Sequence, residues 1–332
     1  MKKTSIGCLG LFLVVALGVS LLLNFVLFTS NSGVKTAALS SSKGYFEKMP
    51  LQGSGSDQVA VVSLYGVISY GMSGEVFASM VEDVVAKLKQ AREDQKVKAV
   101  ILRVDSPGGE VTASDVIYRE LTETRKVKPV VVFMESVAAS GGYYVAVGGS
   151  HLMANELTIT GSIGVILQTF QLGEMSKKIG LDVVTVKSGK MKDILNPFRP
   201  VQPEELALIQ EMIDETYNKF LGVVAEERKK DAEEMRNGLA DGRILSGKRA
   251  LEAGLIDSTG YFDDAVEMAM ELGGVEQASV VEIQAPYNFG RLLRLFGSSI
   301  QNRGEMRVRL GPESLELEAG RLYFISPHVL TR

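Results

Sequence analysis

The sequence predicts an α/β fold built on a parallel β-sheet. Short apolar runs rich in β-branched residues alternate with segments of helical periodicity, a pattern typical of parallel strands covered by helices on both faces. Glycine-rich turns follow three of these runs, where an open parallel sheet usually binds its ligands. An uncharged apolar segment precedes them all and points to export of the remaining chain.

The apolar segment near the amino terminus predicts a membrane anchor. Ile6–Phe28 runs for 23 positions without a formal charge, and at 1.5 Å per residue such a helix spans a hydrocarbon core of about 30 Å. Lys2 and Lys3 favour a cytoplasmic location for residues 1–5. The alternative is a cleaved secretory signal, whose apolar region is usually about 7–15 residues. We expect a single-pass anchor in the cytoplasmic membrane and a catalytic domain on its extracytoplasmic side.

The rest of the chain divides by composition into three parts. Residues 29–57 are rich in Ser, Gly and Lys and predict a flexible stalk. Residues 58–286 carry the alternating pattern and form the main domain. Residues 287–332 become basic and lose clear periodicity, so we interpret them as a tail or small appendage.

The individual elements follow from the periodicity of the main domain. Strands are expected at Val59–Tyr65, Val97–Val104 and Pro129–Met134, and two further strand–helix passes at Leu157–Phe170 and Leu181–Lys187. Helices are expected at Val76–Leu88, Thr112–Arg125, Glu204 to about Arg236, Gly247–Ala253 and Asp263–Leu272. The long helix has an apolar stripe from Leu206 to Phe220, which predicts a buried face.

Composition argues against several classes of function. A net charge of −4, without basic runs interleaved with aromatic residues, gives no reason to expect nucleic acid as a partner. The single cysteine, Cys8, allows no intrachain disulfide or cysteine-rich zinc site. With His151 and His328 as its two histidines, the chain is poorly equipped for a histidine metal site. We therefore expect neither a metal nor an organic cofactor.

The three glycine-rich turns are Ser106–Gly109, Ala138–Gly142 and Thr160–Gly164. None matches the glycine spacing of a phosphate-binding loop, and any one alone could serve only to bend the chain. Together they suit a reaction centre, because glycine lets the backbone approach a substrate closely. Ser140, flanked by small residues, is the candidate nucleophile. The N–H groups of Gly141 and Gly109 are the candidate oxyanion donors.

A serine nucleophile needs a general base at neutral pH. His151 follows Ser140 by eleven residues, beyond the short helix expected after Gly141, so we expect a structural or surface role for His151. A lysine can serve instead if burial lowers its pKa from about 10.4 toward neutrality. Lys187, Lys190 and Lys192 all lie in one segment, and the residues alone do not choose among them.

Four stretches in this order resemble the signal peptide peptidase A (protease IV) family: LRVDSPGGEVTASDVI, SVAASGGYYVA, TITGSIGVI and VKSGKMKDI. The resemblance runs from about Val59 to Leu272. It implies the crotonase-like fold shared with the Clp protease and enoyl-CoA hydratases. Members of the signal peptide peptidase A family degrade signal peptides that are left in the membrane after cleavage.

The resemblance also implies roles for individual residues. Ser140 matches the family's nucleophile and Lys192 its general base, which selects one of the three lysines. Ser162 matches the serine that hydrogen-bonds the lysine amine and orients it, and Gly109 and Gly141 match the oxyanion donors. Small members of the family form homo-oligomeric rings in which the adjacent subunit supplies the lysine.

These observations predict a membrane-anchored serine endopeptidase, with residues 58–286 as its peptidase domain and hydrophobic peptides such as signal peptides as substrates. Two alternatives are an acyl-CoA enzyme on the same fold and a non-catalytic membrane scaffold. The first would explain the glycine turns but not the export segment. The second would leave the pairing of Ser140 with Lys192 without a purpose.

Overall fold

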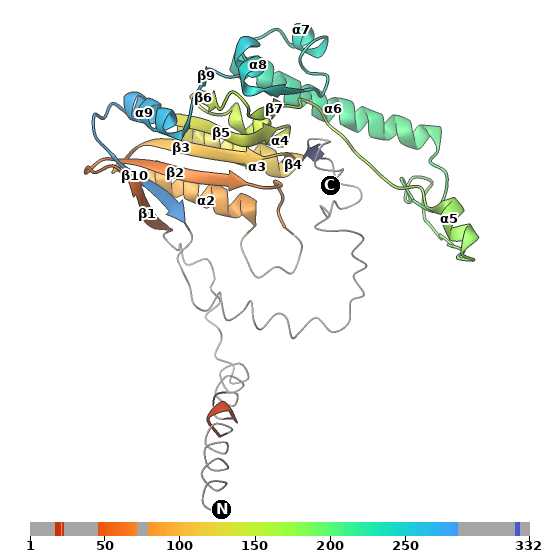
Figure 1. Cartoon of the computed structure of the whole chain (residues 1–332). Coiled ribbons are helices and arrows are strands. Elements are labelled where there is room, and N and C mark those ends of the chain that lie inside the picture. The colour runs from red at the N-terminus through yellow and green to blue at the C-terminus, as the bar shows by residue number, and fades with distance from the viewer. Residues whose placement is uncertain (1–16, 21, 23–45, 72–78, 285–322, 326–332) are drawn as a thin grey trace, which may run out of the picture. The chain divides into compact units, whose positions relative to one another are not determined.

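The computed structural model describes residues 17–20, 22, 46–71, 79–284 and 323–325, the last three as backbone only. The chain divides into two compact units, Met1–Tyr45 and Phe46–Arg332. Residues 17–20 of the first unit are helical (Figure 1). The predicted anchor Ile6–Phe28 lies mostly outside the described residues, and no helix within these is long and apolar enough to cross a membrane.

The second unit contains a mixed nine-stranded sheet, which confirms the predicted α/β class. Its strands are β1 (Glu47–Gln52), β2 (Gln58–Tyr65), β3 (Val97–Ser106), β5 (Val130–Ala139), β6 (His151–Ala154), β7 (Ile159–Gly161), β8 (Ile244–Ser246), β9 (Ser258–Thr259) and β10 (Ser279–Gln284). The main order is β1-β10-β2-β3-β5-β6-β9. All neighbours from β10 to β9 run parallel, whereas β1 pairs antiparallel with β10.

Strand β5 changes its neighbour along its length, and this change shapes the site described below. Its first half pairs in parallel with β6, and its last residues, Val137–Ala139, pair in parallel with β7. Strand β8 then pairs antiparallel with β7. The carboxyl ends of β3, β5 and β7 therefore lie at one edge of the sheet.

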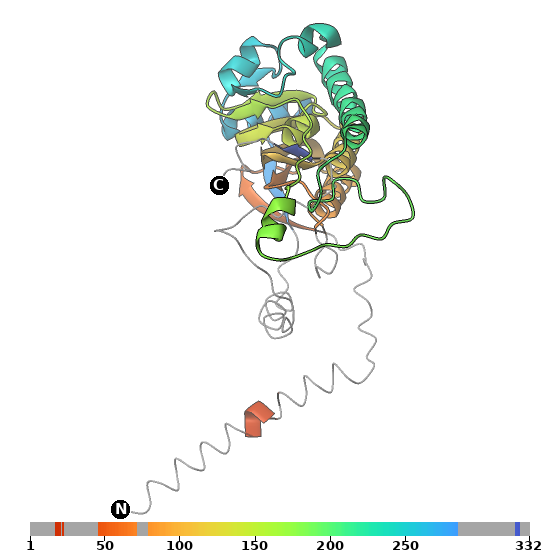
Figure 2. The same ribbon diagram turned by 90° about the vertical axis from the view of Figure 1, so that its right-hand side faces the viewer.

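Both faces of the sheet are covered, because alternate residues of each central strand point to opposite faces. One face is packed by α2 (Met80–Glu93), α3 (Val111–Arg125), α4 (Gly141–Ala146) and the carboxyl-terminal half of α6 (Pro203–Arg228). The other face is packed by α9 (Phe262–Gly273). In β3, Leu102 points to the first core and Ile101 to the second, and both are fully buried. Figure 2 shows these layers from the side.

Between β7 and the buried half of α6, residues 170–212 form an excursion that we call the arm. It contains α5 (Gly173–Lys178) and the amino-terminal half of α6, and Figure 1 shows both extending away from the sheet. Within the arm, Ser176 and Glu205 are the two buried residues. The arm therefore has almost no core of its own.

Two predictions for this region are wrong. Leu181–Lys187 forms no strand and is exposed throughout, with Val186 94% exposed, because no neighbouring strand of the described chain takes up its backbone hydrogen bonds. The predicted stripe on the long helix is buried at Phe220, whereas Leu206 remains 54% exposed. No apolar side chain of residues 203–212 belongs to either hydrophobic core of the described residues.

The long helix also ends earlier than its periodicity predicts. Lys229 follows α6 in the left-handed conformation, with φ 52°, which ends the helical hydrogen bonding. The side chain of Asp231 then accepts from the N–H of Glu234 and starts the separate helix α7 (Ala232–Arg236). The helices predicted near Gly247 and Asp263 form as α8 (Gly247–Glu252) and α9.

Two segments outside the predicted main domain contribute strands. The predicted stalk, residues 29–57, includes β1, so the folded unit begins near Phe46 and the stalk's boundary at residue 57 is corrected. The predicted tail includes β11 (Tyr323–Ile325), which pairs antiparallel with β4 (Gly108–Glu110). Both pairings join residues more than 200 positions apart, which local sequence patterns do not reveal.

Candidate active site

Ser140 occupies the sharp turn between β5 and α4. Its backbone has φ 54° and ψ −117°, a conformation that residues other than glycine rarely adopt. The N–H of Ser140 donates to the carbonyl of Gly161, and its own carbonyl accepts from the N–H of Tyr144, both at 2.8 Å. Strained residues of this kind cluster at functional sites, and a strained serine between a strand and a helix suits a nucleophile.

The hydroxyl of Ser140 is buried, and its Oγ has no hydrogen-bond partner within the part of the chain that the structure describes. Burying a hydroxyl without a partner destabilises a protein by about 1–3 kcal/mol. Such a group in a native structure calls for an explanation. One explanation that suits the geometry is that Ser140 Oγ meets a reacting group that is not among the described residues.

Helix α4 fixes this turn firmly, because all six of its residues are buried. Tyr143 donates from its hydroxyl to the carbonyl of Leu255 at 2.8 Å. Gly142 lies so close to β3 that a Cβ there would be 2.7 Å from the carbonyl oxygen of Ser106. Glycine is therefore required at position 142 for packing, independently of any catalytic role.

Ser162 lies beside Ser140. Ala139 of β5 pairs with Gly161 of β7, so the two serines each follow a member of the same register pair. Adjacent strands are about 5 Å apart, which brings the two turns side by side. Ser162 also has a positive φ of 52°, and its N–H donates to the carbonyl of Arg243 at 2.8 Å.

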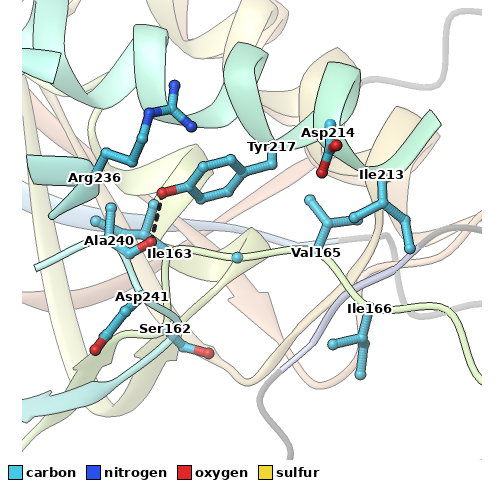
Figure 3. A pocket seen from close by; sticks show the side chains of 12 residues that line it. Ser162, Ile163, Val165, Ile166, Ile213, Asp214, Tyr217, Arg236, Ala240 and Asp241 are labelled. Atoms are coloured by element: carbon cyan, nitrogen blue, oxygen red, sulfur yellow. Dashed lines mark hydrogen bonds between the residues drawn. The ribbon is translucent and has the colours of Figure 1, made fainter. Parts of the chain in front are cut away.

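A cavity of about 460 Å³ opens beside Ser162 (Figure 3). Ile163, Val165 and Ile166 contribute one apolar side. Tyr217 of α6 lies opposite and donates from its hydroxyl to the carbonyl of Ala240 at 2.6 Å. Ser162 is thus reached from this cavity.

The strand β4, which carries Gly109, packs against α4 at this edge. The N–H of Ile68 donates to the carbonyl of Gly108, and the N–H of Glu110 donates to the carbonyl of Ile68. The N–H and carbonyl of Gly109 therefore point to the other side of β4, where Phe324 of β11 lies opposite. A Cβ at Gly109 would lie 2.0 Å from the carbonyl oxygen of Ile68, so this position excludes any side chain.

Gly141 is the first residue of α4, and its N–H has no acceptor within the helix. The edge of the sheet therefore brings together a strained serine, a second serine and Gly141, whose N–H suits an oxyanion. The N–H of Gly109 faces the strand β11 in this structure. Backbone donors of this kind typically contribute about 3–4 kcal/mol each to transition-state stabilisation.

The three candidate lysines all lie in the part of the arm between α5 and α6, two helices that Figure 1 shows extending away from the sheet. Lys187 donates from Nζ to Asp193 Oδ1 at 2.5 Å and to the carbonyl of Lys190 at 3.1 Å. Lys190 donates from Nζ to Glu204 at 3.4 Å. The ammonium of Lys192 forms no hydrogen bond or ion pair with any residue that the structure describes.

Helix α6 sets the separation between the arm and the nucleophile. Phe220 is fully buried against Tyr144 of α4, with ring centroids 5.1 Å apart. Glu205 precedes Phe220 by fifteen residues, which is about 22 Å along a helix. The helix therefore holds the Lys192 segment away from the Ser140 turn of the same chain, and the two are not brought together.

Two features of this region were missed at the level of sequence. Ser106 accepts from the N–H of Gly108 at 3.2 Å and stabilises the turn before β4, a contact that its Ser-Pro-Gly-Gly sequence could have suggested. The second missed feature is an ion-pair network around Arg199, which is described below.

His151, for which we expected a structural or surface role, forms a hydrogen bond through Nε2 with the hydroxyl of Ser258 at 2.8 Å.

Comparison with known proteins agrees with this geometry. A profile of the Clp protease family matches residues 60–167, and a profile of peptidase family S49 matches residues 122–276. The first match fits the mixed sheet, which has a Clp-protease-like α/β fold. The second includes Ser140, Ser162 and Lys192.

Three similar proteins illustrate the range of relatives. "Putative protease MJ0651" of Methanocaldococcus jannaschii is 37% identical over 83% of this chain and 88% of its own length. "Putative signal peptide peptidase SppA" of Enterococcus faecium is 35% identical over 70% of this chain and 68% of its own. "Serine protease SPPA, chloroplastic" of Arabidopsis thaliana is 35% identical over 74% of this chain, but only 37% of that protein is covered.

Proposed function

The chain belongs to peptidase family S49 and is a serine endopeptidase, and we propose that it works with a Ser–Lys dyad. Ser140 is the nucleophile in this proposal and Lys192 the general base. The observation that carries it is the strained turn at Ser140 with its buried, unpartnered Oγ. A hydroxyl held in this way is ready to meet a base and a carbonyl without first breaking another hydrogen bond.

In the proposed reaction, Ser140 Oγ attacks the peptide carbonyl while the neutral amine of Lys192 accepts its proton. The N–H groups of Gly109 and Gly141 donate to the oxyanion. Collapse of the tetrahedral intermediate returns the proton from Lys192 to the leaving amine and leaves an acyl-enzyme. Water then attacks the ester, again with Lys192 as base, and releases the carboxylate product.

The pairing of the arm's lysines supports Lys192 as the base. A carboxylate partner stabilises the charged ammonium, and the base must be the neutral amine. Lys187 and Lys190 both have carboxylate partners, whereas Lys192 has none among the described residues. Ser162, beside Ser140 and open to a cavity, is placed in this proposal as the residue that hydrogen-bonds and orients the amine.

We test the dyad with a fluorophosphonate probe and two substitutions. Ser140→Ala should abolish both labelling and peptide cleavage, and Lys192→Ala should abolish cleavage without unfolding the protein. Lys190→Ala is the matched control and should retain most of the activity. If Lys190→Ala were inactive and Lys192→Ala active, the assignment of the base would be wrong.

We further propose that neighbouring subunits of a homo-oligomer share each active site. The helix α6 holds Lys192 far from the Ser140 turn of its own chain, and the arm leaves apolar side chains such as Val184 and Phe170 exposed. A second copy of the chain would cover such side chains and supply the lysine. Desolvation at that contact would also lower the lysine's pKa toward the working range.

The sharing is tested by co-assembling two inactive variants, Ser140→Ala and Lys192→Ala. Where an intact Ser140 meets a neighbour's intact Lys192, activity returns in proportion to mixing. Co-assembled oligomers that stay inactive would mean that each chain carries its own dyad.

The proposed substrates are apolar peptides, including cleaved signal peptides, and the proposed location is the extracytoplasmic face of the cytoplasmic membrane. The apolar segment Ile6–Phe28 and the name of the Enterococcus faecium relative support both. The edge of β4 also accepts an extended segment, β11, in antiparallel pairing, which is how a peptide substrate can bind. Faster cleavage of a signal-peptide-like substrate than of a charged soluble peptide is expected, and the reverse order would contradict the proposal.

A further inference from the structure

The loop that carries Lys192 is a series of tight turns. The N–H of Lys192 donates to the carbonyl of Gly189 at 3.1 Å, and the N–H of Ile194 donates to that of Met191 at 3.2 Å. Leu195 has a positive φ of 59°, which is unfavourable for a residue with a side chain. A strained backbone persists only where its surroundings hold it in place.

Arg199 supplies many of the hydrogen bonds that stabilise this loop. Its Nε donates to Asp193 Oδ2 and its Nη2 to Asp193 Oδ1, each at 2.9 Å. Nη2 also donates to the backbone carbonyl of Asp193 at 2.9 Å. The guanidinium thus fixes both the side chain and the backbone of the residue next to Lys192.

The same guanidinium reaches the first turn of α6. Its Nη1 donates to Glu205 Oε2 at 2.9 Å, and its Nη2 donates to Glu205 Oε1. Glu205 is 2% exposed and also accepts from the N–H of Gln202, as part of the helix cap. Arg199 therefore joins the lysine loop to the end of a helix whose other half is anchored in the core beside α4.

Both carboxylates of this network stay charged wherever a lysine base could work. Hydrogen bonds from Arg199 and Lys187 hold the pKa of Asp193 well below its usual range. Hydrogen bonds from Arg199 and from the N–H of Gln202 lower the pKa of Glu205 to about 2. Both carboxylates can therefore accept from Arg199 throughout the pH range in which a lysine base works.

We propose that Arg199 is a positioning residue for catalysis, because it clamps the Lys192 loop onto α6 through Asp193 and Glu205. The inference rests on the proposed role of Lys192 as the base. The loop lies at the end of an arm with almost no core, so apolar packing cannot hold it. A planar guanidinium with two bidentate partners can do so with little freedom left. A displacement of about 1 Å in a reacting group can lower a rate about 100-fold.

The experiment compares Arg199→Ala, Arg199→Lys and Asp193→Asn, with Lys177→Ala as control. Lys177 lies in the same arm and forms an exposed ion pair with Glu174, so its loss should leave activity unchanged. Arg199→Ala should lower kcat about 100-fold with little change in KM. Arg199→Lys should fall between, since one ammonium cannot bridge two carboxylates in bidentate fashion.

The pH profile separates positioning from general destabilisation. In the proposed assembly the contact with a neighbouring subunit desolvates the lysine, and a lysine displaced from that contact would be more fully hydrated, which favours its charged form. The rising limb of kcat/KM should therefore move to higher pH in Arg199→Ala and Asp193→Asn. Thermal unfolding and oligomer size are measured on each variant.

An unchanged kcat and an unchanged limb in Arg199→Ala, alongside an inactive Lys192→Ala, would overturn the clamp and leave the dyad standing. Full activity of Lys192→Ala would instead remove the proposed function. If Arg199→Ala fails to fold or assemble, the isosteric Asp193→Asn decides, and an unchanged limb in that variant overturns the clamp equally.

Discussion

Replacing Ser140 by glycine should leave the protein more stable than replacing it by alanine, although neither variant cleaves peptides. The φ of 54° at this position costs a residue other than glycine about 1–3 kcal/mol. Glycine removes that strain but adds about 0.5–1 kcal/mol through the greater freedom of its unfolded chain. The mid-range values favour Ser140→Gly by about 1 kcal/mol.

The comparison isolates the backbone, because both variants remove the hydroxyl and any hydrogen bond it makes in the assembled enzyme. At about 2–4 °C per kcal/mol for a domain of this size, thermal unfolding should show a Tm about 2–4 °C higher for Ser140→Gly. Urea unfolding gives the free-energy difference directly, provided both variants show the same slope.

A matched pair at Ser176 serves as the control. Ser176 is also buried, but it lies within the helix α5, where glycine is about 1 kcal/mol less favourable than alanine. The order of stability should therefore reverse at that position. A Ser140→Gly variant that is no more stable than Ser140→Ala would refute the argument that the nucleophile's turn stores strain.

Four further outcomes are expected. Ser162→Ala should lower kcat/KM less than Ser140→Ala or Lys192→Ala does, because in the proposed dyad Ser162 would orient the base without bonding to the substrate; an equal loss in a peptide assay would contradict this. The wild-type kcat/KM should rise with pH along a limb set by deprotonation of the lysine, and a steady fall from about pH 6 to 9 in a stable enzyme would exclude a lysine base. Phe220→Ala should destabilise the fold by about 3–5 kcal/mol in urea unfolding, since this fully buried ring packs on Tyr144; a loss under about 1 kcal/mol would show that α6 is not anchored there. Burial acts to raise the pKa of Asp257, but hydrogen bonds from Arg228 and from the N–H of Leu152 outweigh burial and leave the pKa below 3.8. The charged carboxylate therefore stabilises the fold above pH 3.8, and this stabilisation is lost as the pH falls through the folded-state pKa. Asp257→Asn should accordingly cost about 1–3 kcal/mol at neutral pH and less as the solution is acidified, and a constant difference would rule out the ion pair as the cause.

The central strands were predictable from sequence because they are buried on both faces. Runs such as Val59–Tyr65 are apolar at nearly every position, and that pattern leaves little choice of environment. The edge strand β1 was not predictable, because Pro50 together with the polar residues Glu47, Lys48 and Gln52 is typical of a linker. Its strand character comes from pairing with β10, more than 200 residues away, and local pattern carries no information about that partner.

The two serine turns were located for a topological reason. They follow strands, and parallel strands end together at the edge where ligands bind. The role of Lys192 needed the family resemblance, since three lysines share one segment. The contacts of Arg199 escaped notice because charged residues in loops usually form solvated surface. Only the fold reveals that Glu205 is buried and that one guanidinium joins it to Asp193.

Two errors of the sequence analysis, the predicted strand Leu181–Lys187 and the start of the stripe on α6, fall in the same part of the molecule, and this coincidence has a physical meaning. Leu181–Lys187 and the start of the α6 stripe both have the apolar pattern of buried segments. A single chain nevertheless leaves Leu181–Lys187 exposed, and in the stripe it leaves Leu206 and Met212 exposed. Apolar patterns report the environment that a sequence suits, so these two suit one that the isolated chain does not provide. The segment between them carries Lys192 and is joined through Arg199 to Glu205, which lies about 22 Å along α6 from the buried Phe220. A neighbouring subunit that covers the arm would therefore bring the base to a nucleophile in the same step. Assembly and catalysis would then depend on one contact, and dilution to the monomer should remove activity and expose the arm together.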